Sequence, residues 1–215
     1  MSTIGVLGAG HIGRNFSIAV IARGHDVVIA NAQGPETLAA LVAELGPSAR
    51  AATAAEAAAA GDWALVAIPL GGVEALPVDE LADKVVLATC NYFAQRDGPL
   101  AEIDSGRLTV PAYVQARLPE SRVGRAFNHI DAAQIVSDGS PKGTPNRRAL
   151  AFAADDADVR TVASDLYEEL GFDAVDVGGL DEAWRLDVDQ PTFVVRQNAG
   201  ELRANVARAQ RHVTA

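Results

Sequence analysis

The sequence has few of the features that mark secreted, membrane-spanning or nucleic-acid-binding proteins. Its 215 residues include one cysteine, Cys90, so no internal disulfide can form and the fold does not need an oxidising compartment. No apolar run approaches the about 18 residues of a transmembrane helix, and no signal-peptide pattern opens the chain. It lacks a long basic run, and its formal net charge of −10 argues against nucleic acid or an anionic membrane as partner. We therefore expect a cytoplasmic protein with neither partner.

A glycine turn follows the apolar run at residues 3–7 and precedes a helix-like stretch. Gly8, Gly10 and Gly13 give the spacing GxGxxG. In dinucleotide-binding units the first glycine allows a tight turn, the second admits the pyrophosphate, and the third lets the helix pack on the strand. A β-rich run at 26–30 closes the unit at the expected distance. This context predicts a dinucleotide site, and the alternative is a turn used for packing alone.

His11 and Ile12 lie inside the same turn, at the start of the predicted helix. Helix N-termini bind anions through backbone N–H groups. We include both residues in the predicted phosphate site, where the backbone N–H of His11 suffices without its side chain.

Apolar runs of strand length alternate with helix-like segments along the rest of the chain. Such alternation predicts an α/β fold, a Rossmann-like doubly wound parallel sheet with helices on both faces. The predicted strands are 3–7, 26–30, 63–68, 85–88, 123–127, 150–154 and 174–177, and the predicted helices are 12–22, 35–45, 51–60, 110–118 and 158–170. We predict a Rossmann-like domain over 1–178 and a small helical segment over 179–215.

Five further candidate residues lie at or just after the ends of predicted strands, where ligands bind in such sheets. Ile68, Pro69 and Leu70 would form an apolar wall for the cofactor, unless they only pack the loop. Asn91 would orient a nicotinamide carboxamide or a ribose, unless it only caps a turn. Asn128 lies on the same edge and completes the predicted cofactor-binding set.

The sequence shows no obvious triad or metal cluster. Hydride transfer between stacked rings needs proximity and orientation more than an acid or base, so we single out no catalytic residue and predict no metal. His129 and Cys90 are more typical of packed side chains than of a proton donor and a nucleophile. Lys142, Arg147 and Arg148 are more typical of solvated loop charges than of a site for an anionic coenzyme tail.

Short motifs follow one another in a specific order along nearly the whole chain. They are VLGAGHIG (6–13), AIP (67–69), NY (91–92), RDG (96–98), AFN (126–128), GTP (143–145), ELGF (169–172) and AWR (183–185). In this order they resemble the coenzyme F420-dependent NADP oxidoreductases. The resemblance implies hydride exchange between a nicotinamide and a deazaflavin, on a Rossmann-like domain with a small C-terminal part, often as a dimer.

The sequence departs from these oxidoreductases after the second predicted strand. NADP-specific members of the family usually place Ser and Arg there to hold the 2′-phosphate, whereas this chain has Asn31, Ala32 and Gln33. No Lys or Arg occurs between Arg23 and Arg50, and no Asp or Glu ends the strand in the manner usual for NAD. Asn31 and Gln33 would hydrogen-bond ribose hydroxyls. The cofactor is therefore NADP or NAD, with a slight preference for NAD or dual use.

These observations favour an NAD(P)-dependent oxidoreductase that passes hydride between a nicotinamide and a small-molecule redox partner, either a deazaflavin (F420) or a flavin-like molecule. A homodimer is a further expectation. One alternative is a non-catalytic dinucleotide-binding protein or sensor, which the altered 2′-phosphate site supports. The other is a reductase of a small imine or carbonyl compound, although related enzymes usually add a large helical domain for which the chain after Gly179 is too short.

Overall fold

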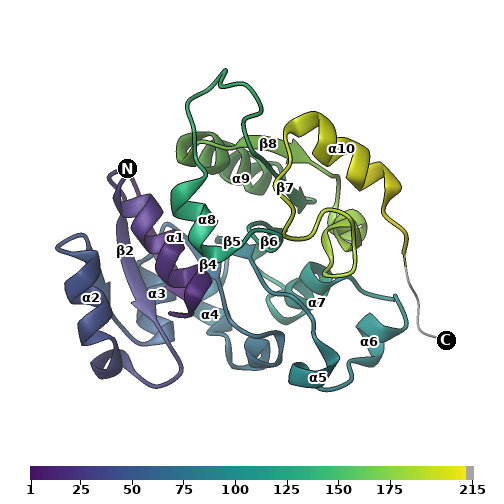
Figure 1. Ribbon diagram of the computed structural model, residues 1–215. Coiled ribbons are helices and arrows are strands. Elements are labelled where there is room, and N and C mark those ends of the chain that lie inside the picture. Colours follow the sequence, from purple (N-terminus) through teal and green to yellow (C-terminus); the bar gives the residue numbers. More distant parts are fainter. Residues whose placement is uncertain (212–215) are drawn as a thin grey trace.

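Eight short strands form one sheet with helices packed on both faces (Figure 1), as the computed structural model of residues 1–211 shows. The strands are β1 (Thr3–Leu7), β2 (Asp26–Ala30), β3 (Ala49–Ala51), β4 (Trp63–Val66), β5 (Val85–Ala88), β6 (Arg122–Arg125), β7 (Ala149–Ala154) and β8 (Asp173–Asp176). Their spatial order is β3-β2-β1-β4-β5-β6-β7-β8. This arrangement confirms the predicted Rossmann-like α/β fold.

The helices between and after the strands are α-helices and 3₁₀ helices, the latter labelled η. They are α1 (His11–Ile21), η1 (Pro35–Leu38), α2 (Ala39–Leu45), α3 (Ala54–Ala60), η2 (Leu70–Ala75), α4 (Val78–Leu81), α5 (Ala94–Asp97), α6 (Ala101–Asp104), α7 (Val110–Arg117), α8 (Ala132–Ser137), α9 (Ala157–Leu170), η3 (Leu180–Leu186) and α10 (Ala199–Arg208). Within residues 1–211, none of these helices has the length and apolar character needed to cross a membrane.

Side chains from alternate strand positions build a core on each face of the sheet. Ile4 and Val6 of β1 pack in one core with Phe16 of α1, and this core also holds side chains from α8 and α9. Val66 of β4 packs in the other core with Ala57 of α3, alongside side chains from α4 and α7. Because parallel strands are covered on both faces, their sequences are apolar almost throughout.

The sheet differs from the prediction in two places. β7 runs antiparallel to β6, over the pairs Gly124–Ala154 and Arg125–Ala153, and β8 then runs parallel to β7. The sheet is therefore mostly rather than wholly parallel. The second difference is β3, a three-residue edge strand that pairs with β2 in a stretch where no strand was predicted.

The chain after Gly179 continues as η3, a non-helical stretch and α10. Leu202 of α10 is buried with Ala151 of β7, Val175 of β8 and Leu186 of η3. Residues 180–208 therefore pack against the end of the sheet formed by β7 and β8. Of the segment predicted over 179–215, residues 212–215 lie outside the described part of the chain.

Candidate functional site

Two of the three positions in the turn must be glycine, because nearby backbone atoms leave no room for a Cβ. Gly8 has a φ of +119°, and a Cβ there would overlap the carbonyl oxygen of Ala67. A Cβ on Gly13 would overlap the carbonyl oxygen of Gly8. These positions tie the start of α1 to the ends of β1 and β4, so a larger residue at either position would displace the backbone.

Gly10 differs from its two neighbours, because nothing in the structure lies within 4 Å of a Cβ built on it. It is the N-cap of α1, with a φ of −77° and no capping side chain, and the first turn holds no acidic residue. The first N–H groups of a helix lack intrahelical partners and carry a partial positive charge. The turn therefore presents open space and backbone donors to an anion, as a pyrophosphate site needs.

The loop after β2 is organised by the side chain of Asn31. Its Oδ1 accepts hydrogen bonds from the backbone N–H groups of Gln33 and Gly34, both at 3.0 Å, and its Nδ2 donates to Oγ1 of Thr37. Gln33 is exposed. Asn31 therefore shapes the loop.

The apolar wall predicted after β4 is only partly present. Ile68 is half-buried and Pro69 is exposed, so both can face a ligand. The prediction is wrong for Leu70, which is 1% exposed and packs with Val66 and Val73 in the core. The chain enters η2 at this residue, and that turn directs the Leu70 side chain inward.

Asn91 and Asn128 meet at the carboxyl ends of β5 and β6. Nδ2 of Asn91 donates to the backbone oxygen of Asn128 at 2.8 Å, and Nδ2 of Asn128 donates to Oδ1 of Asn91 at 3.1 Å and to the Leu186 oxygen at 2.6 Å. Asn128 is almost fully buried. The two amides therefore hold one another and η3 in place, and Asn91 is the more exposed of the two.

A buried arginine that sequence reasoning missed joins this pair to the C-terminal segment. Arg125 is 1% exposed, and its Nη2 donates to Oδ1 of Asn91 at 3.0 Å. Its Nη1 donates to the Ala183 oxygen at 2.9 Å and to Oδ1 of Asp187 at 2.6 Å. The signal in the sequence is a charged residue within the otherwise apolar run 123–127. A buried charge needs a partner, because an unpaired one is costly.

His129 and Cys90 are buried beside these strand ends. Burial, followed by the positive charges of Arg125 and Arg148, lowers the pKa of His129 from 6.5 to about 3. Its Nε2 accepts a hydrogen bond from the Ala151 N–H at 3.0 Å, as a neutral imidazole can. Burial raises the pKa of the Cys90 thiol to about 11. Both side chains are therefore packed and uncharged near neutral pH.

The interpretation of Arg147 and Arg148 as solvated loop charges is wrong, because both are buried. Arg147 pairs with Glu168 at 2.9 Å and with Asp173 at 2.8 Å, and Arg148 pairs with Asp138 at 2.6 Å. These guanidiniums join the loop before β7 to neighbouring elements. They offer no accessible site for an anionic tail.

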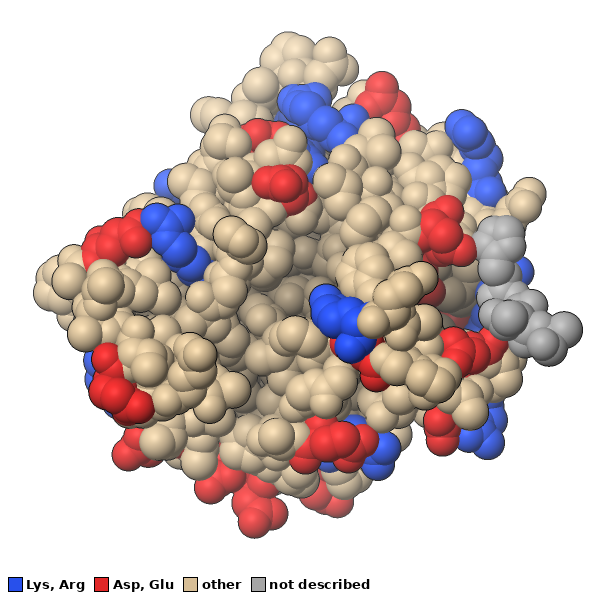
Figure 2. Space-filling model, turned by 60° about the horizontal axis from the view of Figure 1, so that its bottom comes forward, with Lys and Arg blue, Asp and Glu red and all other residues tan. Residues whose placement is uncertain are grey.

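The carboxyl-end face of the sheet is hollowed at its middle, with largely uncharged walls and charged residues toward its rim (Figure 2). A cavity of about 360 Å³ is lined by side chains after β5, including Tyr92 and Phe93, and by Asp187 and Asp189 of the C-terminal segment. In residues 1–211 no group of three or more His, Cys, Asp or Glu side chains is arranged to hold a metal ion.

Residues 3–92 match the model of the family described as NADP oxidoreductase coenzyme F420-dependent. This stretch runs from β1 through the glycine turn to Asn91 and Tyr92, so the match confirms the resemblance over that part of the chain. No curated protein matches the chain in sequence.

Solved structures resemble the protein over most of its length. A hypothetical protein from Sinorhizobium meliloti has 26% identity and a TM-score of 0.79, covering 92% of this chain and 96% of that one. A protein from Arthrobacter sp. FB24, provisionally assigned as an F420-dependent NADP reductase, has 24% identity and a TM-score of 0.73, covering 85% and 87%. A reductive aminase from Aspergillus terreus, solved with NADPH, has 14% identity and a TM-score of 0.59, covering 84% of this chain but 56% of that one.

The family match over residues 3–92 and the fold support an NAD(P)-dependent oxidoreductase.

The open space at Gly10 predicts that dinucleotide binding can be removed without loss of the fold. In Gly10→Val the added side chain occupies the space that the pyrophosphate needs, so NADH and NADPH binding should be abolished in calorimetric titrations. The free energy of unfolding should change by no more than about 1 kcal/mol. Unchanged cofactor affinity in this variant would show that the phosphate site lies elsewhere.

The lowered pKa of His129 predicts a loss of stability as the pH falls from 6.5 toward 3. In this window the unfolded chain takes up a proton on His129 and the folded protein does not, so the free energy of unfolding should fall by about 1.4 kcal/mol per pH unit. Above pH 6.5 this contribution is constant. Urea unfolding between pH 7 and pH 5 measures the slope.

His129→Gln is the control, since glutamine can accept the Ala151 N–H but does not titrate. Its unfolding free energy should have a slope shallower by about 1.4 kcal/mol per pH unit. Equal slopes in the two proteins would contradict the assignment.

Proposed function

We propose that the protein transfers hydride between NAD(P)H, bound on the glycine turn, and a deazaflavin or flavin-like acceptor at the same sheet edge. The observation that carries this proposal is the open, uncapped N-terminus of α1 at Gly10, which lies on the same edge as Asn91 and Asn128. The match of residues 3–92 to the F420-dependent family supports the acceptor class.

The glycine turn and the strand ends bind different parts of the dinucleotide. Gly8, Gly10, His11, Ile12 and Gly13 form the pyrophosphate site through the backbone. Because the first N–H groups of α1 are directed at the anion, no cationic side chain is needed at this point.

The adenosine ribose and the nicotinamide are bound by side chains, in contrast to the pyrophosphate, which is bound by the backbone. Asn31 and Gln33 meet the adenosine ribose, Ile68 and Pro69 flank the nicotinamide, and Asn91 orients its carboxamide. The bound nicotinamide supplies a hydride with both electrons, and the proton that completes reduction of the acceptor comes from solvent. The protein then contributes proximity and orientation, which suits an edge where His129 is neutral and buried.

The same protein also has a cellular location and an assembly state to which the sequence and structure point. We propose a cytoplasmic enzyme, supported by a single buried cysteine that forms no disulfide, and a homodimer, which the family resemblance implies. The division into a Rossmann-like domain (1–178) and a C-terminal segment (179–215) is proposed on the position of η3, which begins at Leu180.

A reductase of small imine or carbonyl compounds is the second candidate, favoured by the structural likeness to the reductive aminase. This chain spans 56% of that enzyme's length, so the likeness covers the sheet domain and leaves the rest of that enzyme without a counterpart here.

The proposed reaction predicts that purified protein will catalyse hydride transfer between NADPH or NADH and oxidised F420. Stopped-flow absorbance would follow loss of the nicotinamide signal together with reduction of the deazaflavin, and Gly10→Val would serve as the inactive control. Binding of nicotinamide without turnover of any deazaflavin or flavin would favour the sensor hypothesis. Turnover of cyclic imines in its place would favour the second candidate.

The loop after β2 predicts weak discrimination in favour of NADPH, or a preference for NADH. Gln33→Arg, alone or with Ala32→Ser, places a cation where the 2′-phosphate lies and should strengthen NADPH binding by about 1.5–3 kcal/mol, roughly ten-fold or more in Kd. NADH affinity should barely change. Gln33→Met, of similar size but uncharged, is the matched control: it removes the amide proposed to meet the ribose, so any loss of affinity should be similar for NADPH and NADH.

Calorimetric titration of the unmodified protein tests the premise. If it binds NADPH at least roughly a hundred-fold more tightly than NADH, a gap of about 2.7 kcal/mol, a cation from elsewhere in the fold reaches the phosphate.

A further inference from the structure

The side-chain amide of Asn91 is oriented by neighbours that cannot exchange donor and acceptor roles. The guanidinium of Arg125 has only donors, and its Nη2 donates to Oδ1 of Asn91 at 3.0 Å. Nδ2 of Asn91 donates to the backbone oxygen of Asn128 at 2.8 Å, and a carbonyl can only accept. If the amide turned over, its oxygen would face that carbonyl and its nitrogen would face the guanidinium. The orientation of the Asn91 amide is therefore determined.

The amide of Asn128 is oriented from its other side by His129. Nε2 of His129 accepts from the Ala151 N–H at 3.0 Å, so the proton of this neutral ring is on Nδ1, which lies 3.4 Å from Oδ1 of Asn128. Nδ2 of Asn128 then donates to the Leu186 oxygen at 2.6 Å and to Oδ1 of Asn91 at 3.1 Å. Oδ1 of Asn91 therefore accepts from two donors, this amide and a guanidinium, which together use both of its lone pairs.

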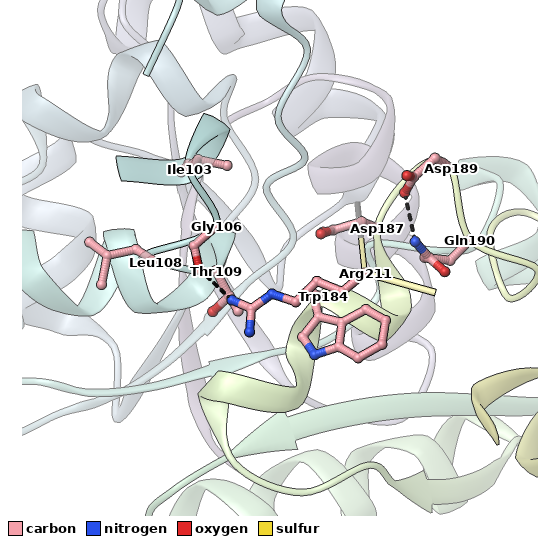
Figure 3. A pocket seen from close by; sticks show the side chains of 9 residues that line it. All are labelled: Ile103, Gly106, Leu108, Thr109, Trp184, Asp187, Asp189, Gln190 and Arg211. Atoms are coloured by element: carbon pink, nitrogen blue, oxygen red, sulfur yellow. Dashed lines mark hydrogen bonds between the residues drawn. The ribbon is translucent and has the colours of Figure 1, made fainter. Parts of the chain in front are cut away.

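The C-terminal segment holds the other end of the Arg125 guanidinium. Nη1 donates to the Ala183 oxygen at 2.9 Å and to Oδ1 of Asp187 at 2.6 Å. Asp187 lies in the wall of a small cavity with Trp184 of η3 (Figure 3). Because Arg125 is 1% exposed, turning it away from Asn91 would leave buried donors without partners, which is costly. Nη2 is therefore kept directed at Asn91.

One hydrogen of the Asn91 amide remains for a ligand. Its NH2 group has two hydrogens, and the backbone oxygen of Asn128 accepts one of them. Within residues 1–211, no second acceptor contacts this nitrogen. Asn91 is half-buried and follows β5, on the sheet edge that also carries the glycine turn. Toward a cofactor, the Asn91 side chain is therefore a hydrogen-bond donor and not an acceptor.

We propose that Asn91 recognises the carbonyl oxygen of the nicotinamide carboxamide and makes no use of the carboxamide NH2 group. This inference rests on the proposed function, which places the nicotinamide beside Asn91, and it names the chemical feature that the site selects. A pyridine dinucleotide with a carbonyl oxygen at this position pairs the remaining hydrogen of Asn91. One that offers only a donor leaves that hydrogen unpaired, at a cost in affinity.

Two cofactor analogues test the proposal, because each changes one side of the carboxamide. The 3-acetylpyridine analogue keeps the oxygen and replaces NH2 by a methyl group, whereas the thionicotinamide analogue keeps NH2 and replaces the oxygen by sulfur, a weaker acceptor. The unmodified protein is titrated calorimetrically with NAD⁺ or NADP⁺, whichever binds more tightly, and with its two analogues. The Kd of the acetyl analogue should lie within about two-fold of that of the parent cofactor, and the Kd of the thio analogue should be about five-fold higher.

The substitution Asn91→Asp should reverse this selection. The carboxylate still accepts from Arg125 and Asn128, but it offers a ligand an acceptor where Asn91 offers a donor. The parent carboxamide can turn its NH2 toward this acceptor, and the acetyl group cannot. The acetyl analogue should therefore bind about five-fold more weakly than the parent, and the thio analogue should bind as tightly as the parent. Thermal unfolding checks that the variant is folded, and the comparison in the unmodified protein tests the proposal without it.

Gln95→Glu is the matched control for the change of charge. It makes the same replacement of an amide by a carboxylate at an exposed position of α5, four residues from Asn91. Its charge acts on all three cofactors alike. The ratios of the three Kd values should therefore equal those of the unmodified protein.

The outcomes separate this inference from the proposed function. A thio analogue that binds the unmodified protein as tightly as the parent would overturn the role of Asn91, and so would equal Kd ratios in Asn91→Asp and the unmodified protein, whether or not hydride is transferred. The expected ratios without hydride transfer to F420 or a flavin would support the role of Asn91 and overturn the proposed reaction. If none of the three cofactors binds, both proposals fail.

Discussion

The guanidinium of Arg125 is the group on which the arrangement of the site depends. A charge that is 1% exposed must be matched by buried acceptors, because its desolvation is otherwise uncompensated. The acceptors come from the loop after β5, from η3 and from Asp187 beyond it. This side chain therefore joins the C-terminal segment to the strand ends, together with the buried apolar contacts of Leu186 and Leu202. Asn128 reinforces the same junction through the Leu186 oxygen.

Much of the sheet could be predicted because most of its strands contain continuous apolar runs. The strand predicted at 85–88 coincides with β5, and the first two strands also match their predicted bounds. β3 was missed because it has three residues, with Arg50 between two alanines that favour helix, and its strand conformation comes from pairing with β2. The antiparallel direction of β7 was also missed, since apolar patterning does not encode strand direction.

The candidate site was less accessible to sequence reasoning than the fold. The glycine spacing is a local signal, and the structure gives Gly8 and Gly13 the close contacts expected of them. Arg125 and Asp187 are 62 residues apart, so no local pattern joins them. Arg147 was misjudged for the same reason, because its partners Glu168 and Asp173 belong to α9 and β8. In the sequence, charged residues beside turns look like solvent-exposed loop residues. Their burial becomes apparent only when their ion-pair partners, distant in the chain, are known.

The two edges of the sheet bear on how copies of the protein behave at high concentration. An open sheet exposes unpaired backbone groups along its edge strands, and these can recruit strands from other molecules. Here one edge is the three-residue β3, and the other is β8, which has Asp173 and Asp176 at its two ends. A short edge gives an incoming strand few hydrogen bonds, and β8 is itself only four residues long. Together with the acidic net charge, this arrangement disfavours fibril-like growth through the sheet and directs any self-association to helical or loop surfaces.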